Sequence, residues 1–224
     1  MNKVAFLTTV FPENEKFLKT FFNSLSAQTY KNFDLVIVND DFKNLDFYKD
    51  LYSNLNIIDI NSYNTPAKNR EVGINYCIDQ NYEILAFGDS DDYFKDNRIE
   101  KSLELLKKSD VIINDLSLFD ENSVYEKNYL SNRLKNLDII DFEFIKDKNI
   151  FGMTNTAIKL NGIEKVSFDK EIRAIDWYFF KSLLRKDCKA IFTNETESFY
   201  RQHKNNTTGL SVKNNKYYLW WETK

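Results

Sequence analysis

The chain of 224 residues is long enough for one domain with a well-buried core, and its 42% hydrophobic and 16% aromatic residues exclude a disordered polypeptide. A formal net charge of −3 provides no overall basic field, so we expect no nucleic acid partner. No apolar run approaches the ~20 residues of a membrane span, and the N-terminal apolar stretch is too short for a signal peptide. Two widely separated cysteines fit a reducing compartment, so we expect a cytoplasmic protein.

Apolar, β-prone runs alternate with helix-like segments through the first half of the chain. The predicted strands comprise residues 4–10, 33–38, 55–60, 82–88 and 111–113. Helices are predicted around residues 17–25, from Pro66, which suits a first helical turn, and from Asn97, which resembles a capping box with Glu100. This alternation predicts an α/β fold in which helices cover both faces of a mainly parallel sheet.

The second half is less regular. Residues 116–149 are charged and aromatic without a clear period, and we interpret them as a subdomain or lid. Residues 157–160 are a predicted strand, and residues 176–184 are a predicted helix.

Three carboxylates lie within four residues in the segment Asp89-Ser90-Asp91-Asp92, directly after a predicted buried strand. Such carboxylates repel one another strongly unless a cation neutralises them. Mg²⁺ and Mn²⁺ take oxygen ligands of this kind and usually share them with substrate phosphates. The alternative is an acidic, solvated turn with an Asp helix cap, and the cluster alone does not decide between the two.

Other charged residues are predicted to reach the same place. Asp40 and Asp41 end the second strand, and Arg70 opens the helix before the acidic segment. Because ligands of open parallel sheets bind beyond the carboxyl ends of the strands, one crevice would collect all of these side chains. This convergence favours a metal–diphosphate site, with an Asx turn as the alternative for the Asp pair and a surface salt bridge as the alternative for Arg70.

In order and spacing, these motifs resemble those of family 2 glycosyltransferases. Residues 28–41 (QTYKNFDLVIVNDD) resemble the opening of the family, residues 67–75 (AKNREVGIN) its helix start, and residues 87–92 (FGDSDD) its metal motif. Asp176 lies where the family carries its catalytic base. Residues 200–209 resemble the Y-R-x-H-x-x-N-x-x-G segment of bacterial surface-polysaccharide members, especially rhamnosyltransferase-like ones.

The chain departs from the family pattern at two places. No glycine follows Asp40 and Asp41, so the turn after the second strand must differ. Ile175 stands where the family usually has an acidic residue before its catalytic aspartate.

The resemblance implies a GT-A type, Rossmann-like single domain, with residues 1–115 as the nucleotide-sugar half and residues 116–224 as the acceptor-binding half. The implied nucleotide-sugar contacts are Thr9, Asp40, Asp41, Asn69, Arg70, Asp89 and Ser90. The implied metal ligands are Asp91, Asp92 and His203, with a nearby hydrogen-bond acceptor as the alternative for Asp92 and a structural or exposed role as the alternative for His203. Asp176 is the implied general base, and a helix N-cap is its alternative.

The expected function is that of a Mn²⁺- or Mg²⁺-dependent, inverting glycosyltransferase. By resemblance, it would move a hexose or deoxyhexose from a UDP- or dTDP-sugar to a glycan or lipid-linked acceptor in bacterial surface-polysaccharide synthesis. The protein would then work in the cytoplasm, with peripheral contact at the inner face of the membrane. The oligomeric state stays open, and the aromatic tail at residues 217–221 is expected to pack on the core or to touch a partner or the membrane.

Three rival functions were weighed against this expectation. The first is a catalytically silent domain that binds a sugar nucleotide or serves as a scaffold. A nucleotidyltransferase would carry a glycine-rich loop after the first strand, where residues 8–12 contain no glycine. A phosphatase with an aspartyl nucleophile would carry paired aspartates at that same place, and they are absent too.

Overall fold

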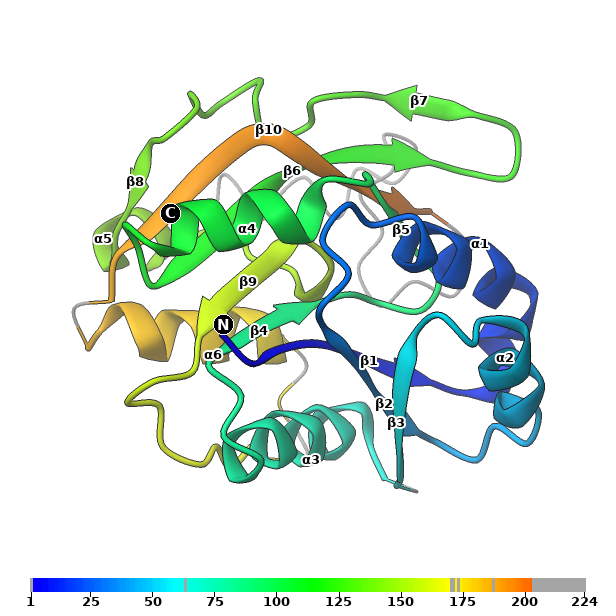
Figure 1. The fold of residues 1–224 in the computed structure, drawn as a ribbon. Helices are drawn as coiled ribbons and strands as arrows, with labels where there is room; N and C mark the ends of the chain where they lie inside the picture. Colours follow the sequence, from blue (N-terminus) through cyan, green and yellow to red (C-terminus); the bar gives the residue numbers. More distant parts are fainter. Residues whose placement is uncertain (1, 63, 170–171, 173, 187, 203–224) are drawn as a thin grey trace.

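Ten strands of the described chain form one sheet, with helices on both of its faces (Figure 1). The computed structural model describes residues 2–62, 64–169, 172, 174–186 and 188–202. The strands are β1 (Val4–Val10), β2 (Asp34–Asn39), β3 (Asn56–Asn61), β4 (Ile84–Phe87), β5 (Tyr93–Phe94), β6 (Val111–Phe119), β7 (Val124–Glu126), β8 (Ile139–Ile140), β9 (Thr156–Lys159) and β10 (Ala190–Arg201). The helices are α1 (Glu15–Ser26), α2 (Leu45–Leu51), α3 (Pro66–Asp79), α4 (Arg98–Leu106), α5 (Phe142–Ile145) and α6 (Ile175–Leu184), with short 3₁₀ turns η1 (Pro12–Asn14) and η2 (Met153–Asn155).

The sheet has a parallel half and a mixed half. Its order is β3-β2-β1-β4-β9-β6-β10-β5, and β3, β2, β1 and β4 are all parallel, which confirms the α/β alternation predicted for the first half. The strand β9 is antiparallel to both β4 and β6, whereas β10 runs parallel to β6 and antiparallel to β5. The parallel half therefore aligns the carboxyl ends of its strands, and the mixed half closes the sheet beside them.

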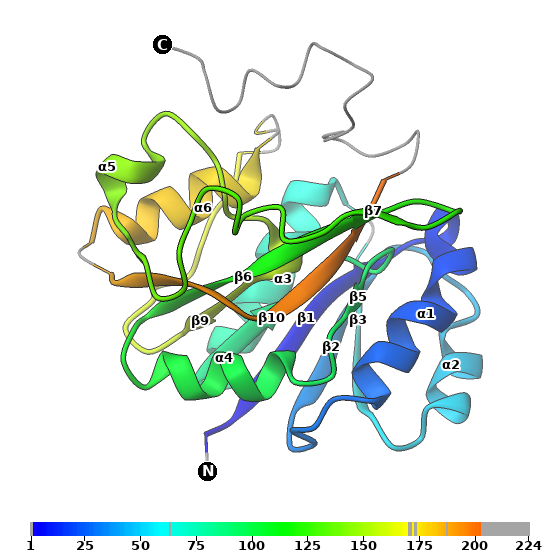
Figure 2. The same ribbon diagram turned by 90° about the horizontal axis from the view of Figure 1, so that it is seen from above.

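Alternation along the strands divides the core into two layers. On β1, Phe6 contributes to the cluster beneath α1, α2 and α4, whereas Leu7 contributes to the cluster beneath α3, α5 and α6. Figure 2 shows these two groups of helices on opposite faces of the sheet. Successive side chains of a strand point to opposite faces, so a strand covered on both faces needs apolar residues at nearly every position, as β1 has.

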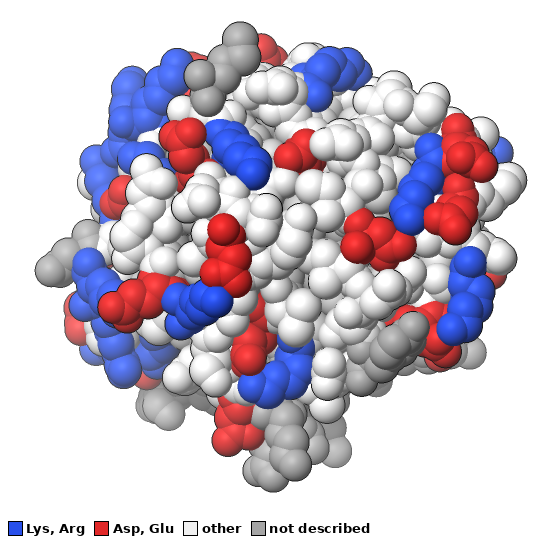
Figure 3. Space-filling view, turned by 60° about the horizontal axis from the view of Figure 1, so that its bottom comes forward, with Lys and Arg blue, Asp and Glu red and all other residues white. Residues whose placement is uncertain are grey.

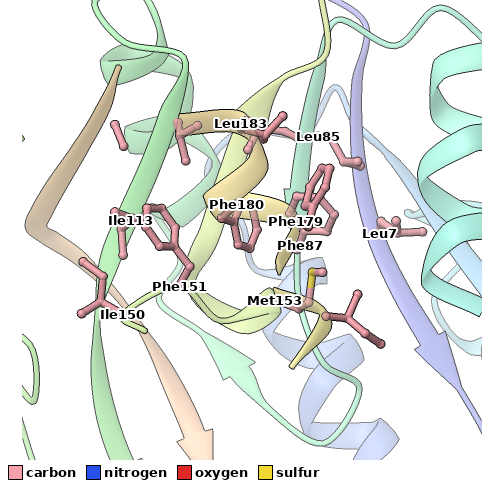
Figure 4. Packing of buried hydrophobic residues seen from close by; sticks show 14 of the residues in the cluster. Leu7, Leu85, Phe87, Ile113, Ile150, Phe151, Met153, Phe179, Phe180 and Leu183 are labelled. Atoms are coloured by element: carbon pink, nitrogen blue, oxygen red, sulfur yellow. The ribbon is translucent and has the colours of Figure 1, made fainter. Parts of the chain in front are cut away.

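Aromatic packing fixes helix α6 against the sheet. Phe179 and Phe180 are buried on this helix and meet the ring of Phe87 on β4 at centroid distances of 6.3 and 5.9 Å. Phe151 stacks on Phe180 at 5.1 Å, and Figure 4 shows these rings gathered beside Met153. The start of α6 is thereby held near the carboxyl end of β4.

Residues 116–149 pack on the sheet, and part of this segment continues β6. This strand extends to Phe119 and is buried along its whole length. The buried carboxylate of Asp115 accepts backbone hydrogen bonds from Leu116 at 2.8 Å and Leu130 at 2.9 Å, and the Ser131 hydroxyl donates to it at 2.6 Å. A buried carboxylate with several hydrogen bonds holds this excursion against β6.

The predicted capping box at Asn97 is wrong. The Asn97 side chain makes no capping bond and donates instead to the carbonyl of Glu195 at 3.2 Å. The N–H of Ile99 is satisfied by Gln28 Oε1 at 3.0 Å, and Glu100 accepts from the Thr29 hydroxyl at 2.8 Å. Tertiary partners thus replace the local cap that the sequence suggested.

None of the helices in the described part of the chain is long and apolar enough to cross a membrane. Lys and Arg are interspersed with Asp and Glu on the face shown in Figure 3, and neither sign forms a continuous field there.

Candidate active site

The acidic loop, defined here as residues Asp89–Asp92, lies at the carboxyl end of β4, beside the ends of β1 and β2. Gly88 leads into it through a tightly packed position, where a Cβ would lie 2.4 Å from Phe6 Cζ and 2.5 Å from Phe94 Cζ. The N–H of Gly88 donates to the Leu7 carbonyl at 3.1 Å, and the N–H of Asp92 donates to the Asp89 carbonyl at 3.1 Å. Glycine is therefore required at position 88 for the chain to turn over the sheet here.

Asp89 faces a small pocket together with Arg70. Arg70 Nη2 lies 3.3 Å from Asp89 Oδ1, and both side chains line the pocket with Thr9 and Met153. Burial raises the pKa of the Asp89 carboxyl, Arg70 opposes that rise, and the charge of Asp91 adds to it. This part of the predicted convergence, Thr9 with Arg70 and Asp89, is present in the structure.

Asp92 lies beneath the surface. Its side chain is fully buried, and Oδ1 accepts the backbone N–H of Arg201 at 2.7 Å. Burial raises the pKa of this carboxyl well above its usual range, and the charges of Asp91 and Asp89 add to the rise. Ser90 is also buried, and its hydroxyl accepts a hydrogen bond from Asn14 at 3.0 Å. The buried side chains of Ser90 and Asp92 thus hold the acidic loop in place through these hydrogen bonds.

A buried arginine lies behind the acidic loop. Arg98 is 1% exposed and donates to the Phe87 carbonyl at 2.5 Å and to Asn114 Oδ1 at 3.0 Å. Its guanidinium lies over the ring of Phe94 at 4.5 Å. Burial lowers the pKa of Arg98 to about 9, and the nearby carboxylates of Asp92 and Asp89 oppose that shift, so Arg98 is protonated at neutral pH. The sequence analysis missed this residue, because a single arginine at a helix start gives no sign of burial.

The aspartate pair after β2 is organised by asparagines. Asn69 is buried, donates to Asp40 Oδ2 at 2.9 Å and accepts from the Ser62 hydroxyl at 2.7 Å. Asp41 adopts a φ of 62°, and the Asn39 side chain closes the turn by accepting from the N–H of Phe42 at 2.8 Å. Asp and Asn tolerate this left-handed conformation better than most residues, which explains how the turn forms without the usual glycine.

A cavity of about 200 Å³ opens beyond β2 and β3. Asp41, Lys43 and Asp59 are among the residues that line it, and Lys43 forms an ion pair with Asp41. The exposed Asp41 thus reaches this cavity, while the Asp40 carboxylate is held by Asn69.

Asp176 lies in the first turn of α6, at the second helical residue. The N-cap is Ala174, so Asp176 does not cap the helix, although its Oδ1 accepts the N–H of Trp177 at 2.8 Å. Burial raises the pKa of the Asp176 carboxyl, and Arg70, the Trp177 N–H and the Asn149 side chain act in the opposite direction. The charge of Asp176 also acts on Asp89, and Arg70 acts on both carboxyls, so the start of α6 and the acidic loop lie within electrostatic range of one another.

Packing around Trp177 supports this placement of Asp176. The Trp177 indole donates from Nε1 to the Ile145 carbonyl at 2.8 Å, which ties the first turn of α6 to α5. Asn149, which contacts Asp176, follows α5 by only a few residues. Neither Asn149 nor the pocket residue Met153 was predicted as part of the site. Asn149 ends the segment 116–149, whose sequence lacks a regular period, and Met153 lies between that segment and the strand predicted at residues 157–160.

The acidic loop offers only oxygen ligands, which is the donor set that Mg²⁺ and Mn²⁺ prefer. Asp92 Oδ2 is buried without a hydrogen-bond partner among the described residues, as expected for an oxygen that awaits a cation or a proton. Within the described ranges, no three His, Cys, Asp or Glu side chains are arranged to hold a metal by themselves. The residues therefore fit a cation that takes part of its coordination from water and phosphate oxygens. His203, the third predicted ligand, lies outside the described residues.

A sequence comparison places the chain in a known family. Residues 6–192 match the profile of glycosyl transferase family 2, so the chain belongs to that family. No curated protein sequence matches the chain.

Solved structures of glycosyltransferases share the fold. S. aureus TarS 1–349 in complex with UDP-GlcNAc superposes with a TM-score of 0.72 at 16% identity, covering 92% of this chain and 60% of TarS 1–349. The mannosyltransferase PcManGT from Pyrobaculum calidifontis, in complex with GDP-Man and Mn²⁺, gives 0.66 at 13% identity, covering 92% of this chain and 59% of that one. GalNAc-T7 with UDP, GalNAc and Mn²⁺ gives 0.64 at 10% identity, covering 90% and 44%. The chain thus spans well under two thirds of each of these proteins, and the likeness confirms a GT-A-like α/β fold.

The positive charge of Arg70 acts on the carboxyls of both Asp89 and Asp176, which leads to a testable prediction. Arg70→Met should raise the pKa of Asp89 and of Asp176, because Arg70 is the positive charge that opposes the effect of burial on both. Carboxyl ¹³C NMR titration measures both pKa values. Lys68→Met, on the same helix but paired with Glu71, is the matched control and should leave them unchanged. Unaltered titration of Asp176 in Arg70→Met would separate the two carboxyls into different sites.

Proposed function

We propose that this chain is the catalytic domain of a metal-dependent, inverting glycosyltransferase. In this proposal it transfers a hexose or deoxyhexose from a UDP- or dTDP-sugar to a glycan or lipid-linked acceptor, in bacterial surface-polysaccharide synthesis. The observation that carries the proposal is the position of Arg70, which pairs with Asp89 of the acidic loop at 3.3 Å and lies within electrostatic range of Asp176 at the start of α6. In the proposed enzyme, the acidic loop binds the diphosphate and Asp176 supplies the base beside it.

The donor half of the cleft, residues 1–115, would bind the nucleotide. Asp41 reaches the cavity beyond β2 and β3, where a base and ribose would bind, while Asn69 orients the Asp40 carboxylate toward them. Asp89 and Thr9 line the neighbouring pocket, where they would accept and donate hydrogen bonds to the ribose. Arg70 supplies a permanently charged, planar group for the phosphates.

The acidic loop would hold the divalent ion. Asp91 is the first ligand in this proposal, and Asp92 either adds its buried oxygen or acts only through the hydrogen bond from Arg201. A bound Mn²⁺ or Mg²⁺ would act as a Lewis acid that stabilises negative charge on the departing nucleoside diphosphate. PcManGT and GalNAc-T7 were both solved with Mn²⁺, which supports a cation of this kind in the fold.

Asp176 would be the general base. One of its carboxylate oxygens takes the proton from the acceptor hydroxyl. In the same step, the hydroxyl oxygen of the acceptor forms a bond to the anomeric carbon. The bond from the anomeric carbon to the diphosphate breaks in the same step, and the diphosphate leaves with the electron pair. A single displacement of this kind inverts the anomeric configuration without a covalent enzyme intermediate.

The environment of Asp176 suits this task. A free aspartate, with a pKa near ~3.9, is a weak base, and partial burial of Asp176 raises its pKa and its basicity. Asn149 and the Trp177 N–H hold the carboxylate through hydrogen bonds. The acceptor would approach from the half formed by residues 116–224, where α5 and α6 border this carboxylate.

The solved structures with this fold contain different sugar nucleotides, so they do not identify the donor of this chain. TarS was solved with UDP-GlcNAc and PcManGT with GDP-Man, so the same architecture accommodates different nucleotides and sugars. A UDP- or dTDP-sugar is proposed here from the motif resemblance, as are the cytoplasmic setting and the contact with the inner face of a membrane.

Asp176→Asn should separate catalysis from binding. Transfer should fall by about a hundred- to ten-thousand-fold, the range typical for loss of a general base, while calorimetric UDP affinity stays within about twofold. In the wild type, the rate should rise with pH through a pKa above that of an ordinary aspartate, because only the ionised base accepts the proton. Unchanged turnover in Asp176→Asn would remove this residue from the mechanism, and turnover absent from the wild type as well would favour a silent binding domain.

Asp91→Ala tests the metal role. UDP affinity measured calorimetrically should depend on Mn²⁺ in the wild type, and the variant should lose most of that dependence because the cation loses a protein ligand. Asp79→Ala, a substitution at the exposed C-terminal end of α3, where Asp79 pairs with Lys165, is the control and should behave as the wild type. UDP binding that ignores Mn²⁺ in the wild type would contradict the proposed metal dependence.

A further inference from the structure

Arg201 joins the end of β10 to the acidic loop, although 109 and 110 residues separate the partners in sequence. Its backbone N–H donates to Asp92 Oδ1 at 2.7 Å, and its side-chain Nε donates to the Asp91 carbonyl at 2.7 Å. The guanidinium therefore holds the peptide that links the two predicted metal ligands.

Two aromatic rings hold this guanidinium in place. Arg201 Cζ lies 4.3 Å from the ring centroid of Phe17 on α1 and 4.3 Å from that of Phe119 on β6. Contact with this aromatic slot, defined here as the rings of Phe17 and Phe119, restricts the rotation of the planar guanidinium. The elements α1 and β6, which lie outside the loop, therefore help to set the direction of the Nε–H bond.

The exit of the acidic loop is attached to the same strand. Tyr93 pairs with Phe199 across β5 and β10, and their rings stack at 4.2 Å with an interplanar angle of 7°. Tyr93 also meets Phe119 edge-on at 4.9 Å. This pairing anchors the residues after Asp92 independently of the Arg201 side chain, which leaves the Asp91 carbonyl as the group of the loop that the arginine side chain holds.

We propose that Arg201 is a positioning residue for the divalent cation: by holding the Asp91 carbonyl, it directs the Asp91 carboxylate toward the cation. The inference rests on the proposed metal dependence of the enzyme. Arg201 has two effects on cation binding, and they act in opposite directions. The positive charge near Asp91 and Asp92 would weaken cation binding, whereas the fixed peptide would strengthen it.

The two effects are distinguished by two substitutions. Arg201→Lys keeps the charge but loses the planar group that fits between the rings, and Arg201→Met removes the charge as well. If positioning dominates, both variants weaken cation binding. If charge dominates, Arg201→Met binds the cation more tightly than the wild type, and Arg201→Lys matches the wild type.

The experiment is a MnCl₂ titration of UDP binding by calorimetry on the full chain. We expect the Mn²⁺ concentration for half-maximal UDP binding to rise about tenfold in both variants, the loss typical when a group that orients a metal ligand is removed. Affinity at saturating Mn²⁺ should stay near that of the wild type. Arg133→Met is the matched control: Arg133 also lies over a ring, that of Tyr129 at 5.3 Å, and donates to the Tyr129 carbonyl at 3.3 Å, so both of these contacts are made outside the acidic loop.

Each outcome decides the inference. A half-saturating Mn²⁺ concentration equal to or below that of the wild type in either variant overturns it, as does an equal loss in Arg133→Met. If both Arg201 variants fail to fold, Phe17→Leu, which removes one ring of the slot, should raise the value by about twofold to threefold, and no rise overturns the inference. A wild type whose UDP binding ignores Mn²⁺ refutes the proposed metal dependence itself and is thus distinguishable from failure of the Arg201 role alone.

Discussion

The structure depends on the balance of charge around the acidic loop. Three carboxylates lie in four residues at the end of β4, and Asp92 among them is fully buried. Burying such charges costs several kcal/mol each unless cations and hydrogen bonds compensate. Arg70 meets Asp89, Arg98 lies behind the loop, and Arg201 holds its backbone. The cost that remains appears as the raised pKa values of Asp89 and Asp92.

The candidate site lies on the parallel half of the sheet, but its balance of charge also requires a residue from the mixed half. The three arginines come from α3, α4 and β10, so the loop is complete only when distant parts of the chain have assembled. The strand β10 is placed by its long parallel pairing with β6, and α4 is placed by packing beneath β4 and β6. Folding of the second half therefore sets the arrangement of the acidic loop on the first half.

Local sequence patterns and the rules of parallel sheets predict the first strands and part of the candidate site. Continuous apolar runs predict β1, β2 and β4, and the rule for the carboxyl ends of parallel strands predicts that Arg70 and Asp89 lie together. The long strand β10 was missed, because its polar middle and its register shift between Thr193 and Glu197 interrupt the alternation. The burial of Asp92 and Arg98 could not be predicted either, because it depends on partners far away in the sequence.

We propose that the acidic loop binds a nucleotide sugar through a divalent cation, and a thermal-shift panel is the direct test of that binding. UDP-, dTDP- and GDP-sugars are each added with Mn²⁺, with Mg²⁺ or with a chelator, and Tm is measured. Ligands that bind only the folded chain raise Tm according to their affinity. We expect a UDP- or dTDP-sugar to raise Tm only when the cation is present. An equal rise in chelator, or no rise with any donor, would refute cation-dependent donor binding.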